Sequence, residues 1–130
     1  MTVRIKHPAL QLDMGITSQL VKFYPAGTGA PTSVTGKGCT VARSTTGTYT
    51  LTFADNDGLT FVGARADYNA DNQATDTNEA TTGEYASNVL TVHTRNKTSG
   101  AAADIAADAD RFVLVEILWA VNTTANGDGV

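Results

Sequence analysis

A strict alternation of apolar and hydroxyl side chains over residues 48–53 constrains the fold more than any other feature of this chain. The run Thr-Tyr-Thr-Leu-Thr-Phe has a period of two, which gives a strand one apolar face and one polar face. The turn sequence Asn-Asp-Gly follows at residues 56–58, and its glycine suits a three-residue hairpin loop. The pattern therefore predicts a β-hairpin over Gly47–Gly63 in which Phe53 lies opposite Phe61.

Short apolar segments separated by Gly- and Pro-rich turns recur along the rest of the chain. They predict an all-β domain, a two-sheet antiparallel β-sandwich of about eight strands with jelly-roll or related Greek-key topology. We expect the domain at residues 15–122, an extended N-terminal arm at residues 1–14 and a flexible C-terminal tail at residues 123–130. Further strands are expected at residues 16–24, 38–43, 64–68, 88–95 and 111–122. The expected core residues are Tyr49, Leu51, Phe53, Phe61, Leu90, Val92, Val113, Val115, Ile117 and Trp119.

Three segments lack a strand pattern. Residues 26–37 carry turn-forming glycines and a proline and are interpreted as a loop. Residues 69–83 are polar and acidic and predict a long loop, either free in solvent or ordered against a neighbouring subunit. Residues 96–110 predict a turn and an Ala-Asp segment with one helical turn around Ile105.

The last expected strand has two apolar faces. One face carries Phe112, Leu114 and Leu118 and is interrupted by Glu116. A strand that is apolar on both faces is usually covered on both sides. Either the Ala-rich segment and loops cover this second face, or it packs on another chain. In the second case Phe112, Leu114 and Leu118 would bind the partner.

Composition excludes several classes of function. The net charge is −4 and the sequence pI is about 4.9, which argues against nucleic acid as a partner. Charged residues make up 17%, below the usual value of about 25%, so the surface is weakly charged and suited to protein contacts. No apolar run approaches the roughly 18 residues of a membrane span, and no signal peptide is recognised. We therefore expect synthesis in the cytoplasm. The single cysteine, Cys39, is interpreted as a buried, inert thiol.

The motifs of common enzymes are missing. The two histidines, His7 and His93, are far apart and outside any metal-ligand spacing, so we expect no metal site and no cofactor. Acidic residues gather in the 69–83 region and in the Ala-Asp segment, and a small hydrolase would use carboxylates such as Asp67 and Asp104. Loops of this composition are usually solvated instead, and the chain is expected not to be an enzyme.

Two segments resemble the small structural proteins of tailed bacteriophages. The run Ala42–Phe53 is similar to an R-x-x-x-G-x-Y-T-x-T-F strand pair of phage virion proteins. The second segment, residues 89–116, resembles their ending, a strand followed by an Ala-Asp segment and a final strand. Within this group the length and the N-terminal arm look most like a capsid cement (decoration) protein.

The resemblance implies a non-enzymatic protein on the outer capsid surface of the virion that stabilises the shell. Its partners would be the major capsid protein and copies of itself, as a dimer or trimer. Arg4, Lys6 and His7 of the arm would meet acidic capsid surface. The alternative is a tail fibre or spike component whose 69–83 loop binds a receptor.

Overall fold

The computed structural model describes residues 15–36, 38–54, 58–72 and 74–121, and within them the chain is all-β without a helix. The eight strands are β1 (Ile16–Ala26), β2 (Gly29–Thr35), β3 (Cys39–Thr45), β4 (Thr48–Phe53), β5 (Leu59–Asn69), β6 (Asn78–Ala86), β7 (Val89–Asn96) and β8 (Phe112–Val121). The predicted arm and tail lie outside the described residues.

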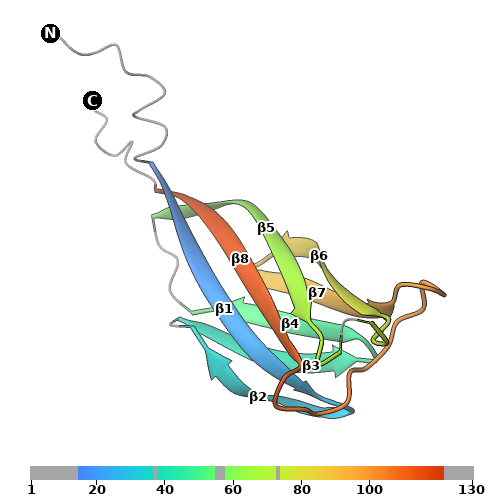
Figure 1. Cartoon of the computed structure of the whole chain (residues 1–130). Coiled ribbons are helices and arrows are strands. Elements are labelled where there is room, and N and C mark those ends of the chain that lie inside the picture. Colours follow the sequence, from blue (N-terminus) through green and yellow to red (C-terminus); the bar gives the residue numbers. More distant parts are fainter. Residues whose placement is uncertain (1–14, 37, 55–57, 73, 122–130) are drawn as a thin grey trace, which may run out of the picture.

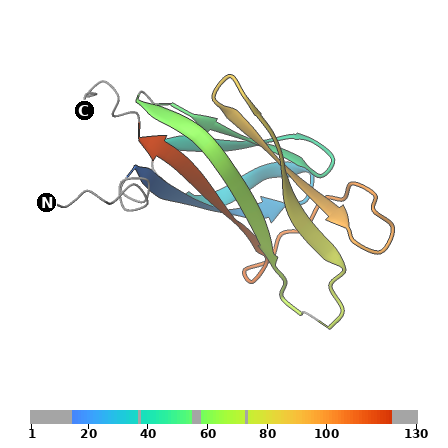
Figure 2. The same cartoon turned by 90° about the horizontal axis from the view of Figure 1, so that it is seen from above.

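The strands form two antiparallel four-stranded sheets that pack face to face (Figure 1). One sheet has the order β2-β1-β8-β5 and the other β3-β4-β7-β6. At one edge of the sandwich β5 lies against β6, as the view from above also shows (Figure 2). The path therefore runs β5, β6, β7 and then returns with β8 beside β5, which is a Greek-key connection. The predicted β-sandwich is confirmed.

The predicted hairpin between residues 47 and 63 is wrong. β4 pairs with β3 on one side and β7 on the other, whereas β5 pairs with β8 in the opposite sheet. The chain crosses between the sheets after β4, because both edges of β4 are already occupied. Phe53 and Phe61 instead contact the same indole in the core, where each ring meets Trp119 edge-on at centroid distances of 5.2 and 6.0 Å.

The interior between the sheets holds the side chains that the alternation assigned to it. All ten predicted core residues lie in or against the core, although Phe61 is only partly buried. Val21, Phe23 and Ile105 are also buried. β5 continues through Gly63, and the register shift between Phe61 and Gly63 is a β-bulge or irregularity in its pairing with β8.

Two of the predicted loops contain strands. Residues 29–35, placed in a loop, form β2, whose pairing with β1 tolerates Pro31 because β2 is an edge strand. Residues 78–83, placed in the long loop, belong to β6, and the loop is therefore restricted to residues 70–77. The backbone groups of these two segments form hydrogen bonds with neighbouring strands, β1 and β7. Local amino-acid composition does not predict such pairing, so both strands were missed.

The connection between β7 and β8 closes one end of the sandwich. The helical turn predicted around Ile105 is wrong, because the backbone groups there bond to the ends of strands instead. The Ile105 carbonyl accepts from the Gly27 amide at 2.8 Å, and the Ala103 amide donates to the Thr94 carbonyl at 3.1 Å. Ile105 is 1% exposed, so this connection buries an apolar side chain of its own.

Candidate interaction surface

The outer face of the β2-β1-β8-β5 sheet carries the most exposed apolar side chains of the described residues. The register pairs Ile16 with Ala120 and Leu20 with Glu116, so even-numbered residues of β1 and β8 point away from the core. Leu20 is 56% exposed and Val62, at the β5 bulge, is 52% exposed. We define the Leu118 patch as Ile16, Leu20, Val62, Leu118 and Ala120.

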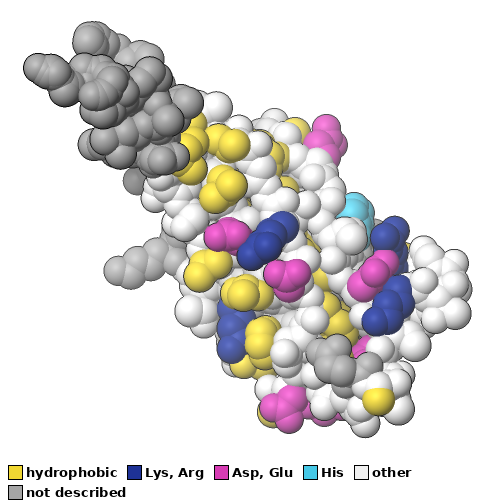
Figure 3. All heavy atoms as spheres, turned by 45° about the horizontal axis from the view of Figure 1, so that its top comes forward, with side chains coloured by type: hydrophobic (Ala, Val, Ile, Leu, Met, Phe, Trp, Pro, Cys, Tyr) yellow, Lys and Arg dark blue, Asp and Glu magenta, His cyan; other side chains and the backbone are white. Residues whose placement is uncertain are grey.

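The Leu118 patch lies at the end of the sandwich where the described chain begins and ends. The Val121 amide donates to the Gly15 carbonyl at 2.6 Å, so the first and last described residues lie side by side at the end of β1 and β8 (Figure 1). In the space-filling view, hydrophobic side chains gather next to that end (Figure 3).

The three predicted partner-binding residues of β8 share the outer face but do not form one patch. Leu118 lies in the Leu118 patch. Glu116 pairs with Arg65 at 3.1 Å and separates Leu118 from Leu114. At the far end Phe112 is covered by Lys22, whose Nζ lies 4.1 Å from the ring centroid. Arg4, Lys6 and His7 lie outside the described residues.

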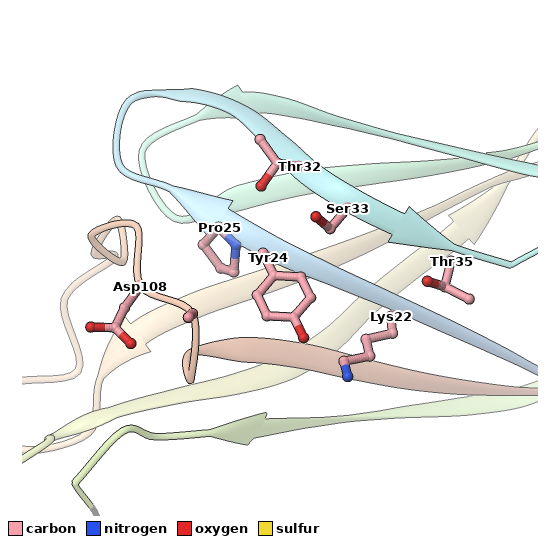
Figure 4. A pocket seen from close by; sticks show the side chains of 8 residues that line it. Lys22, Tyr24, Pro25, Thr32, Ser33, Thr35 and Asp108 are labelled. Carbon is pink, nitrogen blue, oxygen red and sulfur yellow. The ribbon is translucent and has the colours of Figure 1, made fainter.

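A groove occupies the opposite end of the same face. We call it the Tyr24 groove; its volume is about 580 Å³. Side chains from β1 and β2 and from the connection after Ile105 line it (Figure 4). The lining residues are Lys22, Tyr24, Pro25, Thr32, Ser33, Thr35, Asp108 and Ala109.

Sequence reasoning missed the Tyr24 groove because it placed residues 26–37 in a loop. One signal was present in the sequence: Leu20, Lys22 and Tyr24 are two residues apart along one strand, so their side chains lie on the same face. The contribution of β2 required tertiary pairing that the sequence pattern does not reveal.

The acidic residues of the first predicted cluster gather at the edge formed by β5 and β6. The Asp76 carboxylate is 4% exposed and accepts hydrogen bonds from the Tyr68 hydroxyl at 2.6 Å and from the Asn78 amide at 2.9 Å. Burial raises the pKa of Asp76, but these bonds and the charge of Arg111 outweigh burial, so its pKa lies below the ordinary value. Arg111 also binds Asp71 at 3.0 Å, and loop 70–77 is thereby tied to the start of β8.

The carboxylates considered for hydrolysis do not converge. Asp104 pairs with Arg43 at 2.7 Å and accepts from the Gly47 amide, beside the β3–β4 turn. The hydrogen bond from Arg43 lowers the pKa of Asp104, with burial opposing it. Asp67 lies on β5, opposite Leu114, in the other sheet. Across residues 15–36, 38–54, 58–72 and 74–121, no three His, Cys, Asp or Glu side chains are placed to hold a metal ion.

Comparison with known proteins identified no matching family model, no similar curated protein and no similar solved structure. In the described part of the chain, no helix is long and apolar enough to cross a membrane.

Proposed function

We propose that this chain is a non-enzymatic virion structural protein that binds the outer capsid surface through the Leu118 patch and stabilises the shell. The observation that carries the proposal is an exposed apolar patch beside Gly15 and Val121, where the described chain begins and ends. Exposed contiguous apolar surface on a small protein marks a contact site, and the arm extends the contact to the neighbouring subunit. The major capsid protein is the proposed partner.

The energetics favour apolar contact over ion pairs. Exposed pairs formed by Arg4, Lys6 and His7 with acidic capsid surface would each contribute about 0–1 kcal/mol. Apolar burial contributes about 25 cal/mol per Å² before the costs of association. The Leu118 patch should therefore supply most of the binding free energy, with the arm adding to it.

The test is co-sedimentation with purified shells of the phage whose genome encodes the chain. We expect Leu20→Glu, and separately deletion of residues 1–14, to reduce the bound fraction while circular dichroism of the free protein stays unchanged. Val34→Glu is the matched control, because Val34 is exposed (38%) on β2, away from the Leu118 patch. Equal binding of wild type, Leu20→Glu and the truncated form would refute the proposal.

The alternative is a tail fibre or spike component with a receptor-binding loop. The hydrogen bonds from Tyr68 to Asp76 and from Arg111 to Asp71 favour a receptor-binding role for loop 70–77. A loop that is already ordered loses less conformational entropy when it binds. Adhesion to host cells that disappears when residues 70–77 are shortened would support this function over capsid binding. A neighbouring gene for a major capsid protein would favour the cement function, and neighbouring tail genes would favour the alternative.

A further inference from the structure

The Tyr24 groove combines the groups that recognise a polyhydroxylated ligand. Tyr24 presents an aromatic side chain, while Thr32, Ser33 and Thr35 bring hydroxyl groups from β2. Lys22 and Asp108 lie on either side of Tyr24, so a cation and a carboxylate flank the ring (Figure 4). Hydroxyl groups both donate and accept, a carboxylate accepts from hydroxyl groups, and an ammonium group donates.

Neither charged group of the groove is neutralised by an ion pair within the described residues. Lys22 lies over two aromatic rings instead, with Nζ 5.2 Å from the Tyr24 centroid and 4.1 Å from that of Phe112. One Asp108 oxygen accepts from the Asp110 amide at 2.8 Å, which fixes the carboxylate and leaves its second oxygen for another donor. Both groups are thus held in place and available to a ligand.

The backbone around the groove departs from regular strand geometry. Ser33 has φ of 51°, in the left-handed region that non-glycine residues rarely adopt. Register shifts occur on both sides of Tyr24 in the pairing of β1 with β2. Bulges re-aim side chains and strained residues concentrate at functional sites, so these departures agree with a groove shaped for binding.

We infer that the Tyr24 groove binds a saccharide. One face of the sugar ring packs on Tyr24, vicinal hydroxyl groups donate to Asp108, and Lys22 donates to a sugar oxygen. The volume of about 580 Å³ falls within the range of small-molecule sites. The inference goes beyond capsid binding and does not depend on it.

The groove and the Leu118 patch adjoin on the outer face of β1. Lys22 lies two residues beyond Leu20, about 7 Å at the rise of a strand, whereas Tyr24 lies eight residues beyond Ile16, about 26 Å. A partner bound at the Ile16 end of the patch would therefore leave Tyr24 exposed to solvent.

The test is a two-dimensional ¹H–¹⁵N NMR titration of the full chain with a neutral probe, maltotetraose, and an acidic probe, tetragalacturonate. We expect shifts confined to the amides of Lys22, Tyr24, Thr32–Thr35 and Asp108–Ala109 with at least one probe. The two probes distinguish a site for neutral saccharides from a site for acidic saccharides, because only tetragalacturonate offers a carboxylate to Lys22.

Substitution then assigns the contacts. Asp108→Asn should lower the affinity for the bound probe about tenfold, the loss expected for a charge-assisted hydrogen bond. Lys22→Gln should weaken binding of tetragalacturonate more than that of maltotetraose. Glu84→Gln is the control for the loss of one negative charge, because Glu84 is an exposed residue of β6 in the other sheet. The same spectra report whether each variant is folded.

Three outcomes would overturn the inference. They are the absence of shifts with both probes, shifts located outside the groove, and equal affinities of the Asp108→Asn and Glu84→Gln variants. Shifts in the groove that follow protein concentration, and not the probes, would assign the groove to a second copy of the chain.

Discussion

Gly47 occupies the tightest position among the glycines of the described residues. Its φ is 64°, and a Cβ atom there would overlap the Thr94 carbonyl oxygen and lie 2.8 Å from the Ala103 nitrogen. The connection after β7 passes directly over this turn, so the glycine permits the close approach as well as the left-handed conformation.

Replacement of Gly47 by alanine should therefore lower the free energy of unfolding by about 3 kcal/mol, the sum of left-handed strain and overpacking. Gly100→Ala is the matched control, because Gly100 has φ of 77° but open space around its Cα. It should cost only the strain, about 1 kcal/mol. Urea denaturation measures both, and equal losses would show that the predicted overlap is absent.

Cys39 is partly buried against the core, and burial raises the pKa of its thiol to about 11. The thiolate is the reactive form, so the thiol should react with a disulfide reagent at pH 8 about a hundredfold more slowly than a free cysteine. Stopped-flow absorbance with the folded and the urea-unfolded protein gives the two rates. A folded-state rate within about tenfold of the unfolded rate would contradict this expectation.

At the level of elements, the connection between β7 and β8 is held by a short ion pair. Arg43 and Asp104 are 18% and 15% exposed, and Asp104 also accepts from the Gly47 amide. Asp104→Asn should lower the free energy of unfolding by about 2 kcal/mol near neutral pH, as expected for hydrogen bonds to a charged group. Glu79→Gln is the control: Glu79 pairs with Arg95, which is 46% exposed, and should cost about 0–1 kcal/mol.

The stabilisation by Asp104 should decrease as the pH falls. Its folded-state pKa is lowered from the ordinary 3.8, so its contribution is complete above that value. The contribution is lost as the pH falls through the folded-state pKa. The difference between wild type and Asp104→Asn should therefore shrink from about pH 6 to about pH 2, measured by urea denaturation at each pH. A constant difference would mean that the carboxylate charge does not contribute.

The alternation of apolar and polar residues predicted most strands and the core, because every second side chain of a strand points to the same face of the sheet. Pairing was less predictable: residues 48–53 and 59–63 were correctly identified as extended, yet they entered opposite sheets. β2 and β6 were missed because their side chains, such as Thr32 and Thr82, are hydroxylated and their order comes from pairing with β1 and β7. The sequence pattern alone placed Leu118 on the second face of the last strand. The grouping of Leu20 and Val62 with Leu118, and the Tyr24 groove, depend on the pairing of β1, β2 and β5 within the sheet.

At the scale of the described domain, the Leu118 patch extends from the end that holds Gly15 and Val121, and the Tyr24 groove lies toward the opposite end of the same strands. The contact surface and the recognition surface therefore share the outer face of one sheet and meet where Leu20 and Lys22 lie two residues apart on β1. Glu116, which pairs with Arg65, lies opposite Leu20 and separates Leu118 from Leu114 along β8.

Self-association through the Leu118 patch in the absence of shells is the prediction that belongs to the whole molecule, because a second copy and the capsid protein would compete for the same apolar surface. Light scattering should give the mass of a dimer or trimer of the 13.5 kDa chain. Leu20→Glu should yield a monomer, because it places a charge where the contact excludes water, while a substitution at a 56% exposed site leaves the fold's stability within about 0.5 kcal/mol. Val34→Glu adds the same charge away from the patch and should keep the oligomer. A wild-type chain that stays monomeric at high concentration would limit the Leu118 patch to contacts with a different protein.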